Sequence, residues 1–438
     1  MTVDHTRAPV LEALADYHRR GQLSFAPPGH KQARGADPAV REVLGDAVFL
    51  GDVLASGGLD DRLTRGRVLE RAEELMADAV HADHTFFTTC GSSLSVKAAM
   101  LAVAGPHEKL LIGRDAHKSV VSGLILSGIE PVWVEPRWDA ERHLAHPPSA
   151  AEYEQAFEAH PDAKGALVTS PTPYGTCAAL EDIAEVCHRR SVPLIVDEAW
   201  GAHLPFHPDL PSWAMDAGAD ICVTSIHKMG SGLEQGSVFH LRGDLVPPDL
   251  LKMRADLLGT TSPSVLLYAG LDGWRRQMAL RGKELMGGAL DLASRVRAAI
   301  EEIDGMHVND RDDFCGPGLA DDLDPLPGVI DLAELGISGF QAPRTGCTST
   351  GTSTPTSTTT GASGCRSPTA TTRRRPTSCW RRSGTSPGPP RGWTRPRGWR
   401  CRPRPSCGWS RRGCPGTRSS GRPRTCPWPR PPGGSRPR

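Results

Sequence analysis

Apolar residues in the first 341 positions follow two alternating patterns: amphipathic helical spacing, and short runs that are almost continuously apolar. The helical spacing covers residues 68–79, 94–103, 119–127, 151–159 and 180–190. The apolar runs cover residues 85–89, 109–113, 131–134, 165–169, 193–197, 220–224 and 237–241. Runs of this length are typical of strands that are buried on both faces of a parallel sheet. The alternation predicts an α/β fold with a mostly parallel, doubly wound sheet.

The regions on either side of this alternation have a different pattern. Residues 1–60 are interpreted as an N-terminal arm, and residues 61–285 as the large domain. A long helical pattern over residues 263–303 leads away from the last predicted strand. Residues 286–341 are therefore predicted to form a linker helix and the start of a small domain, with a strand at 328–332.

Two charged residues at predicted strand ends indicate a cofactor. Asp197 closes one apolar run, and Lys228 follows the next run along the chain. In open α/β sheets, ligands bind beyond the carboxyl ends of the strands. A partly desolvated lysine has a lowered amine pKa that favours Schiff-base chemistry, and a buried carboxylate needs a cationic partner. The pair predicts pyridoxal phosphate, whose aldehyde needs a lysine and whose ring nitrogen needs an acid. Taken singly, the lysine could be a solvated loop residue and the acid a helix N-cap.

Two further strand ends supply the remaining requirements of this cofactor. Gly91, Ser92 and Ser93 stand between an apolar run and a helical pattern, which places backbone N–H groups and hydroxyls at a positive helix end. His117 follows the run 109–113 and could stack on the cofactor ring. Cys90 is interpreted as a small packing residue rather than a nucleophile. No metal site is predicted, because Pro205 interrupts the His203 and His207 pair.

Together these segments resemble the ornithine/lysine/arginine decarboxylase family, whose members are fold-type-I pyridoxal phosphate enzymes. The resemblance covers roughly residues 25–341, and its motifs occur in the same order along the chain. The matching segments are Pro28–Lys31, Gly58–Asp61, Thr85–Ser93, His117–Ser119, Asp197–Trp200, Ser225–Lys228 and Gly259–Ser264. The chain departs from the family pattern at Gln32 and Ala33, which replace the usual glycine after the first motif.

The resemblance implies a role for most of these residues. Lys228 would hold the cofactor aldehyde as a Schiff base, Asp197 would bind the pyridine nitrogen, and His117 would stack on the ring and assist reprotonation. The residues implied at the phosphate end are Gly91, Ser92, Ser93, Ser225 and His227.

Other roles implied by the resemblance concern the edges of the site. Thr260 and Thr261 match a segment that reaches the cofactor of a neighbouring subunit, which implies a homodimer or a larger assembly with shared sites. Trp200 is interpreted as a pocket wall, while His30 and Lys31 match a motif near the substrate entrance.

Charge is divided unevenly along the chain. Residues 342–438 contain 21 Arg and no Asp, Glu or Lys, whereas the first 341 residues hold 30 basic and all 50 acidic residues. The acidic balance of the first part favours a cytoplasmic enzyme and gives no reason to expect a nucleic-acid partner. No long apolar span predicts a membrane segment.

The last 97 residues have an unusual composition. They contain no Leu, Ile, Val, Met, Phe or Tyr, so they are predicted to be disordered. Their eight residue types are those of G/C-rich codons, and reading one base earlier from Arg344 allows Asp-Trp-Leu-His-Glu-His-Gly, an ordinary protein sequence. We therefore interpret this tail as the product of a reading-frame shift near Ala342, which would truncate the small domain. The alternative is a genuine arginine-rich tail that binds RNA or DNA non-specifically.

The predicted function is decarboxylation of a basic amino acid (lysine, ornithine or arginine) to an amine and CO₂. An aminotransferase or a Cα–Cβ lyase of the same fold remains an alternative, as does an inactive, frameshifted product. Ser225 to Lys228 also fits the S-x-x-K motif of serine acyl-enzymes. That class is disfavoured because its S-D-N and K-T-G motifs are missing, and because a strand rather than a helix is expected at Ser225.

Overall fold

The computed structural model describes residues 3–21, 23, 25–55, 59, 67–337 and 339 of the 438, and the backbone of two short strands at 357–359 and 362–366. The descriptions below concern these residues. The predicted segment Gly58–Asp61 lies outside them except for Leu59.

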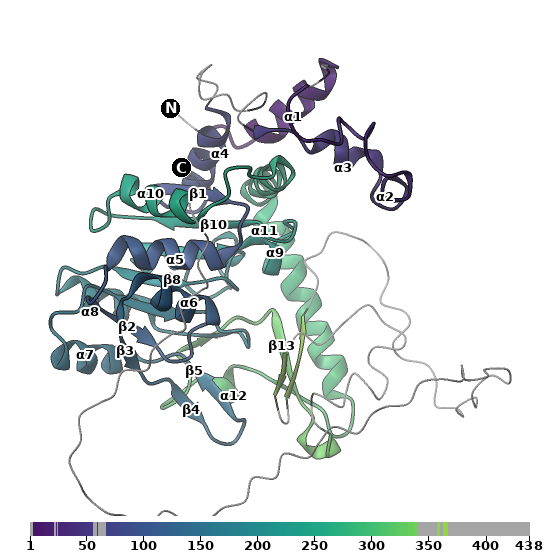
Figure 1. The fold of residues 1–438 in the computed structure, drawn as a ribbon. Coiled ribbons are helices and arrows are strands. Elements are labelled where there is room, and N and C mark those ends of the chain that lie inside the picture. The colour runs from purple at the N-terminus through teal and green to yellow at the C-terminus, as the bar shows by residue number, and fades with distance from the viewer. Residues whose placement is uncertain are drawn as a thin grey trace, which may run out of the picture. The chain divides into compact units, whose positions relative to one another are not determined.

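A seven-stranded sheet forms the centre of the fold, in the order β1-β10-β9-β8-β6-β2-β3 (Figure 1). Its strands in chain order are β1 (His84–Thr88), β2 (Lys109–Gly113), β3 (Glu130–Val134), β6 (Ala166–Thr169), β8 (Leu194–Asp197), β9 (Ile221–Ser225) and β10 (Ser237–Leu241). Five neighbouring strands from β3 to β9 are parallel, and β10 runs antiparallel to both β9 and β1. The mostly parallel, doubly wound α/β sheet is therefore confirmed.

Side chains that alternate along the strands divide the core into two layers. Leu110, Ile112 and Leu167 belong to one hydrophobic cluster, whereas Leu111 and Val168 belong to the other. Successive strand residues point to opposite faces, so each strand must be apolar throughout to bury both. This requirement explains the continuous apolar runs in the sequence.

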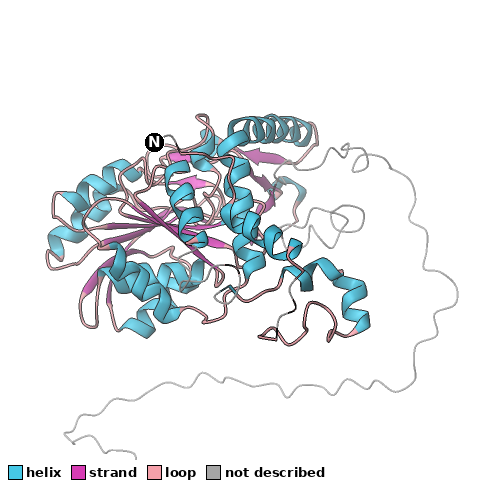
Figure 2. Ribbon diagram, turned by 90° about the horizontal axis from the view of Figure 1, so that it is seen from above, coloured by secondary structure: helices cyan, strands magenta, loops and turns pink. Residues whose placement is uncertain are grey.

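Helices cover both faces of the sheet, and Figure 2 shows the strands lying between them. The helices α5 (Ser92–Val103), α6 (Lys118–Ser127) and α10 (Pro248–Leu258) supply residues to the cluster that contains Leu110. The opposite cluster is built with α1 (Pro9–Arg19), α4 (Val68–Ala79), α7 (Ala150–Ala159), α8 (Leu180–His188) and α11 (Val265–Glu301). No prediction was made for α10, because its start at Pro247-Pro248 reads as a loop.

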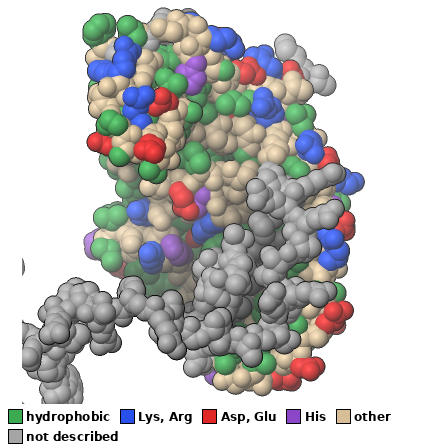
Figure 3. Space-filling view, turned by 90° about the vertical axis from the view of Figure 1, so that its right-hand side faces the viewer, with side chains coloured by type: hydrophobic (Ala, Val, Ile, Leu, Met, Phe, Trp, Pro, Cys, Tyr) green, Lys and Arg blue, Asp and Glu red, His purple; other side chains and the backbone are tan. Residues whose placement is uncertain are grey.

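The N-terminal arm continues beyond α1 into two short helices, α2 (Pro38–Leu44) and α3 (Asp46–Gly51). Its surface is apolar in places: Phe25 is 97% exposed and Val43 is 82% exposed. Figure 3 shows hydrophobic side chains at the surface in the upper part of the molecule, where Figure 1 has the arm. Lys31, Gln32 and Ala33 all have positive φ, between 50° and 76°, so the segment without the usual glycine adopts a left-handed turn.

The chain after α11 returns to the large domain. It forms β11 (His307–Asn309), α12 (Arg311–Phe314), β12 (Asp322–Leu323) and β13 (Pro327–Asp331). Strand β12 pairs with β7 (Thr176–Cys177), and Asp324 lies 3.1 Å from His203, with both side chains buried. The segment that follows Asp197 is therefore held in place by residues that come more than a hundred positions later.

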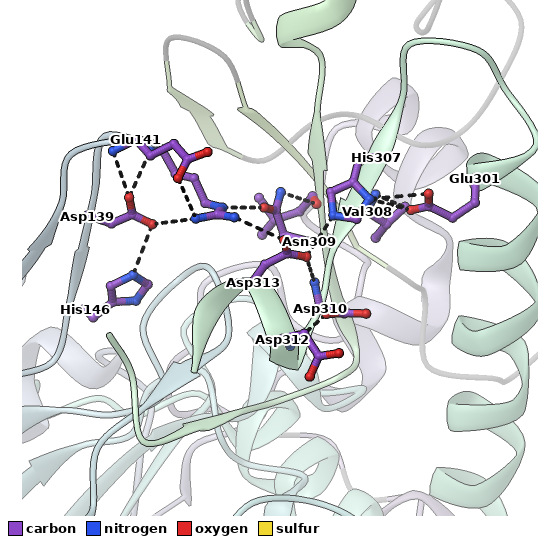
Figure 4. Close-up of polar contacts among 12 residues, drawn as sticks. Asp139, Glu141, His146, Glu301, His307, Val308, Asn309, Asp310, Asp312 and Asp313 are labelled. Atoms are coloured by element: carbon purple, nitrogen blue, oxygen red, sulfur yellow. Dashed lines mark hydrogen bonds and ion pairs between the residues drawn. The ribbon is translucent and has the colours of Figure 1, made fainter. Parts of the chain in front are cut away.

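A second set of polar contacts links this returning segment to a hairpin of β4 (Arg137–Asp139) and β5 (Leu144–His146), as Figure 4 shows. Arg142, in the hairpin turn, donates to Asn309 at 3.0 Å, to Asp313 at 3.1 Å and to Asp139 at 3.3 Å. Burial alone would raise the pKa of Asp139, but hydrogen bonds from Arg142 and Glu141 outweigh it and the pKa is lowered. Arg142 therefore helps to keep Asp139 charged, and it joins the hairpin to Asn309 and Asp313 of the returning segment.

Truncating Arg142 is expected to loosen this junction. Arg142→Ala removes the guanidinium that pairs with the buried Asp139, and it leaves Asp313 with His307 as its remaining cationic partner; this should reduce the free energy of unfolding by about 3 kcal/mol. Arg114→Ala is the matched control, since Arg114 pairs with Glu135 on the exposed surface and such pairs contribute below about 1 kcal/mol. Urea denaturation at pH 7 gives the free energy of unfolding of both variants. An equal loss in the two would contradict a stabilising role of Arg142 at this junction.

Within residues 342–438 the structure describes two short strands, and the predicted disorder of the tail stays a prediction. The strands β14 (Ser357–Thr359) and β15 (Ala362–Arg366) are formed, and β15 pairs antiparallel with β13. Backbone hydrogen bonds can extend a sheet at an open edge whatever the side chains are, which composition alone does not reveal. The rest of the tail lies outside the described residues. Across the described part of the chain, none of the helices is apolar over a length that could cross a membrane.

Candidate active site

The four strands that carry the predicted site residues end at the same edge of the sheet. Strands β2, β8 and β9 run parallel within the sheet, and β1 has the same direction as β9 because both are antiparallel to β10. Their carboxyl ends therefore bring Gly91, His117, Asp197 and Lys228 to one side of the sheet, where open α/β folds bind ligands.

Asp197, His117 and Lys228 form a group at this edge in which each side chain affects the electrostatics of the others. Asp197 is 3% exposed, and desolvation raises the pKa of its carboxyl, while the nearby charges of Lys228 and His117 act to lower it. Burial lowers the pKa of His117, and the positive charge of Lys228 adds to this effect, while Asp197 opposes both. The imidazole is therefore neutral at pH 7, and its Nδ1 lies 2.9 Å from the Ser119 hydroxyl.

Lys228 lies in the single helical turn α9 (Ile226–Met229) that follows β9. Its Nζ lies 4.1 Å from the centre of the Trp200 ring, which comes from the segment after the neighbouring strand β8. Trp200 thus lies beside the amine, and its role as a pocket wall remains a prediction. Ser225 is the last residue of β9, so the strand expected there is confirmed, and the same residue is the N-cap of the single turn α9.

The start of α5 supplies the second part of the site. The Ser225 hydroxyl donates to the Ser92 hydroxyl at 2.6 Å, which joins the end of β9 to the first residue of α5. Gly91 precedes this helix with a φ of 72°, and a Cβ placed on it would meet no atom within 4 Å. Among the described residues no side chain caps α5, and Ser93 is exposed beside Ser92. Backbone N–H groups and hydroxyls therefore face open space at a positive helix end.

The structure does not bring every predicted residue into this group. The His227 Nδ1 lies 3.1 Å from the carbonyl oxygen of Gly236, which it contacts instead of the two serines. Thr260 and Thr261 are exposed on the turn between α10 and α11, where the Thr260 hydroxyl accepts from the backbone N–H of Ser262. Their roles at a cofactor remain predictions.

The residues of the substrate-entrance motif contact their own part of the chain. The His30 Nε2 is 3.1 Å from Asp52, and Lys31 donates to the backbone carbonyls of Phe25 and Ala26. All of these contacts are within the N-terminal arm, so the role suggested for His30 and Lys31 is not tested by them.

Asp115 is a buried acid near Asp197 that the sequence did not single out. Both of its carboxylate oxygens are buried and, among the described residues, neither has a hydrogen-bond partner. A Cβ on Gly113 would lie 2.7 Å from its Oδ1 and 3.3 Å from the Tyr153 hydroxyl, so the carboxyl folds back over the end of β2. Burial, with a smaller contribution from the charge of Asp197, raises the pKa of Asp115 to about 6.

This raised pKa predicts a stability that depends on pH. The folded state holds the proton more tightly than the unfolded chain, whose value is near 3.8, so stability is lost as the pH rises between about 4 and 6. Asp115→Asn should therefore raise the free energy of unfolding by roughly 3 kcal/mol above pH 7, and have almost no effect near pH 4. A urea denaturation series over this range tests it, with the exposed Asp209→Asn as control. A gain in the free energy of unfolding that does not depend on pH would contradict the raised pKa of Asp115.

The geometry of the site fits pyridoxal phosphate. The uncapped start of α5, with the Ser92 and Ser225 hydroxyls, suits a phosphate group. The buried Asp197 carboxyl suits a protonated ring nitrogen, because its desolvation is relieved by a positive charge. Lys228 supplies the amine that an aldehyde requires.

Comparison with known proteins agrees with this interpretation. A sequence model described as Orn/Lys/Arg decarboxylase, major domain, matches residues 8–312. The arginine decarboxylase of Halalkalibacterium halodurans is 39% identical over 336 residues, which cover 77% of this chain and 68% of that protein. The arginine decarboxylase of Bacillus subtilis is 37% identical, again over 77% of this chain and 68% of the relative.

A solved structure supports the fold. That of the constitutive lysine decarboxylase of Escherichia coli has a TM-score of 0.68 and 23% sequence identity, and the match covers 82% of this chain but 57% of that one. The fold is thus the type-I fold of pyridoxal phosphate enzymes, as predicted. The family match extends over most of the chain and includes the strand ends described above. This chain belongs to the Orn/Lys/Arg decarboxylase family, a family of amino-acid decarboxylases.

Proposed function

We propose that this chain is a pyridoxal phosphate-dependent decarboxylase of a basic amino acid, with Lys228 as the residue that binds the cofactor. The observation that carries the proposal is the placement of Lys228, Asp197 and His117 at one sheet edge, beside the uncapped start of α5. Each side chain meets a separate requirement of one cofactor, and the family match is independent of that geometry.

When bound, the cofactor supplies an electron sink for the charge that develops at Cα as CO₂ leaves. Asp197 keeps the ring nitrogen protonated, since a buried carboxylate stabilises a cation next to it. The ring of His117, whose pKa is lowered by burial, would lie against the cofactor and would hold a proton for return to Cα. Lys228 anchors the aldehyde and, once released, can return a proton to the product.

Arginine is the substrate we expect the enzyme to prefer. The two relatives at 37–39% identity are arginine decarboxylases, whereas the lysine decarboxylase structure is only 23% identical. Arginine and lysine differ in charge geometry, because a planar guanidinium needs different partners from a compact ammonium. We also propose a cytoplasmic homodimer, in which the exposed turn of Thr260 and Thr261 reaches the neighbouring site.

A product assay tests the proposed reaction. The purified chain, supplied with pyridoxal phosphate, is incubated separately with arginine, lysine and ornithine, and both CO₂ and keto acid are measured. We expect CO₂ and the matching amine, with arginine used best and no keto acid formed. Keto acid without CO₂ would identify an aminotransferase and overturn the proposal.

An inactive product is a second candidate, favoured by the composition of residues 342–438. Those residues contain no large aliphatic side chain, so they cannot complete a small domain with a normal core. Sequencing the coding DNA around Ala342 tests the frameshift: a corrected frame should restore CO₂ release if the present chain lacks it. One continuous open frame through the tail would remove the frameshift hypothesis.

A further inference from the structure

The contact between Lys228 and Trp200 suggests a role for the indole that goes beyond a pocket wall. The Nζ lies 4.1 Å from the ring centre, well within the range of a cation–π interaction. Both residues are half-buried, and they come from the ends of neighbouring parallel strands. The parallel pairing of β8 and β9 therefore brings both residues to the same edge of the sheet.

Two neighbours of Lys228, the Trp200 ring and the Asp197 carboxyl, favour its charged form and oppose the effect of partial desolvation. The ring face attracts an ammonium through its quadrupole, an interaction that strengthens as water is excluded. The carboxyl of Asp197 also attracts Lys228, as the mutual effect of the two charges shows. The ring has no corresponding attraction for a neutral amine, so the contact favours the protonated form of Lys228.

This selectivity matters because the amine of Lys228 has two situations in the proposed reaction. It is joined to the cofactor at rest, and it is free while a substrate amine takes its place. A free side chain with four rotatable bonds could swing away or lose its proton to solvent. A holding site on the ring keeps it near the cofactor and able to donate.

We propose that the indole face of Trp200 is the holding site for the ammonium of Lys228 whenever that amine is not joined to the cofactor. Trp200 is thus a positioning residue, which acts on the substrate only through Lys228. Its part in the catalytic cycle rests on the proposed function, whereas the contact itself exists in the cofactor-free chain.

The first test uses the full chain without cofactor. The acetylation of Lys228 by acetic anhydride is followed by peptide mass spectrometry across a pH series, since only the neutral amine reacts. The quantity compared is the pH at which half of Lys228 is acetylated, called here the midpoint pH. Trp200→Leu removes the ring and should lower this midpoint pH by about 0.5 to 1 pH unit, and Trp200→Phe should lower it less. Trp138→Leu, an exposed residue of β4, is the control and should cause no shift.

A midpoint pH of Lys228 acetylation that is the same in both Trp200 variants as in the parent would overturn the inference. The Phe variant keeps an aromatic ring and much of the packing, so it serves as the deciding variant if the Leu variant fails to fold. A urea transition equal to that of the parent identifies a folded variant.

The second test separates this inference from the proposed function. Under the proposed function, Trp200→Leu should move the alkaline limb of the kcat profile to lower pH, while Trp200→Phe restores most of it. If acetylation shifts as expected but no variant, nor the parent, releases CO₂, the holding site stands and the proposed function fails. If the parent releases CO₂ but the Trp200 variants shift neither the acetylation profile nor the kcat profile, the holding site is wrong and the proposed function still stands.

Discussion

Lys228→Ala is expected to reduce CO₂ release by at least about a thousandfold, even with excess cofactor. The variant has no amine that can hold the aldehyde in place, and it loses the proton donor beside Trp200. Binding at the start of α5 would remain, so added pyridoxal phosphate can still enter the site without being used. The loss should therefore appear in kcat and should not be recovered by raising the cofactor concentration.

The control for this variant is a lysine of similar exposure outside the site. Lys252 lies on α10 and pairs with Asp256 on the surface, so Lys252→Ala should retain nearly all activity. The measurement is the rate of CO₂ release from arginine at saturating substrate. Retention of more than about a tenth of the activity by Lys228→Ala would show that another lysine performs the chemistry.

Asp197→Asn is expected to change activity and stability in opposite directions. Activity should fall on the order of a hundredfold or more, because a neutral amide no longer keeps the ring nitrogen protonated. Stability of the cofactor-free chain should rise at pH 7, because desolvation raises the pKa of Asp197 above its unfolded value and its charged form opposes folding. At a pH below the unfolded value the gain should vanish, since both states then hold the proton.

Two measurements on the same variant test this account of Asp197. CO₂ release is compared with urea unfolding of the cofactor-free chain, and Asp209→Asn on the surface controls for a general effect of removing a carboxylate. A variant that loses activity and stability together would point to a structural role for Asp197 in place of cofactor binding. A fully active variant would contradict its assignment to the ring nitrogen.

The sheet, and the strand-end positions of the candidate site residues, could be predicted because local pattern determines them. Strand β2 has the same limits as the apolar run 109–113, since both faces of a central strand must be apolar. The ends of such strands are where a parallel sheet binds ligands, so Asp197 and Lys228 could be assigned from position alone.

The rest depends on contacts between distant segments. Asp115 reads as an ordinary loop residue, and only the packing against Gly113 and Tyr153 buries its carboxyl. Arg142 binds Asn309 and Asp313 across more than 160 positions, which no local spacing indicates. Helix α10 was missed for a different reason: two prolines at its start break the expected pattern, although proline is well suited to a first helical turn.

The most direct measurement of the central claim is the identity of the lysine that holds the cofactor. The chain is mixed with pyridoxal phosphate, reduced with borohydride so that the link becomes permanent, digested, and examined by peptide mass spectrometry. The account predicts that the cofactor is attached to the peptide containing Lys228, and that Lys228→Ala abolishes this attachment. Attachment at another lysine, or no attachment to the folded chain, would contradict it.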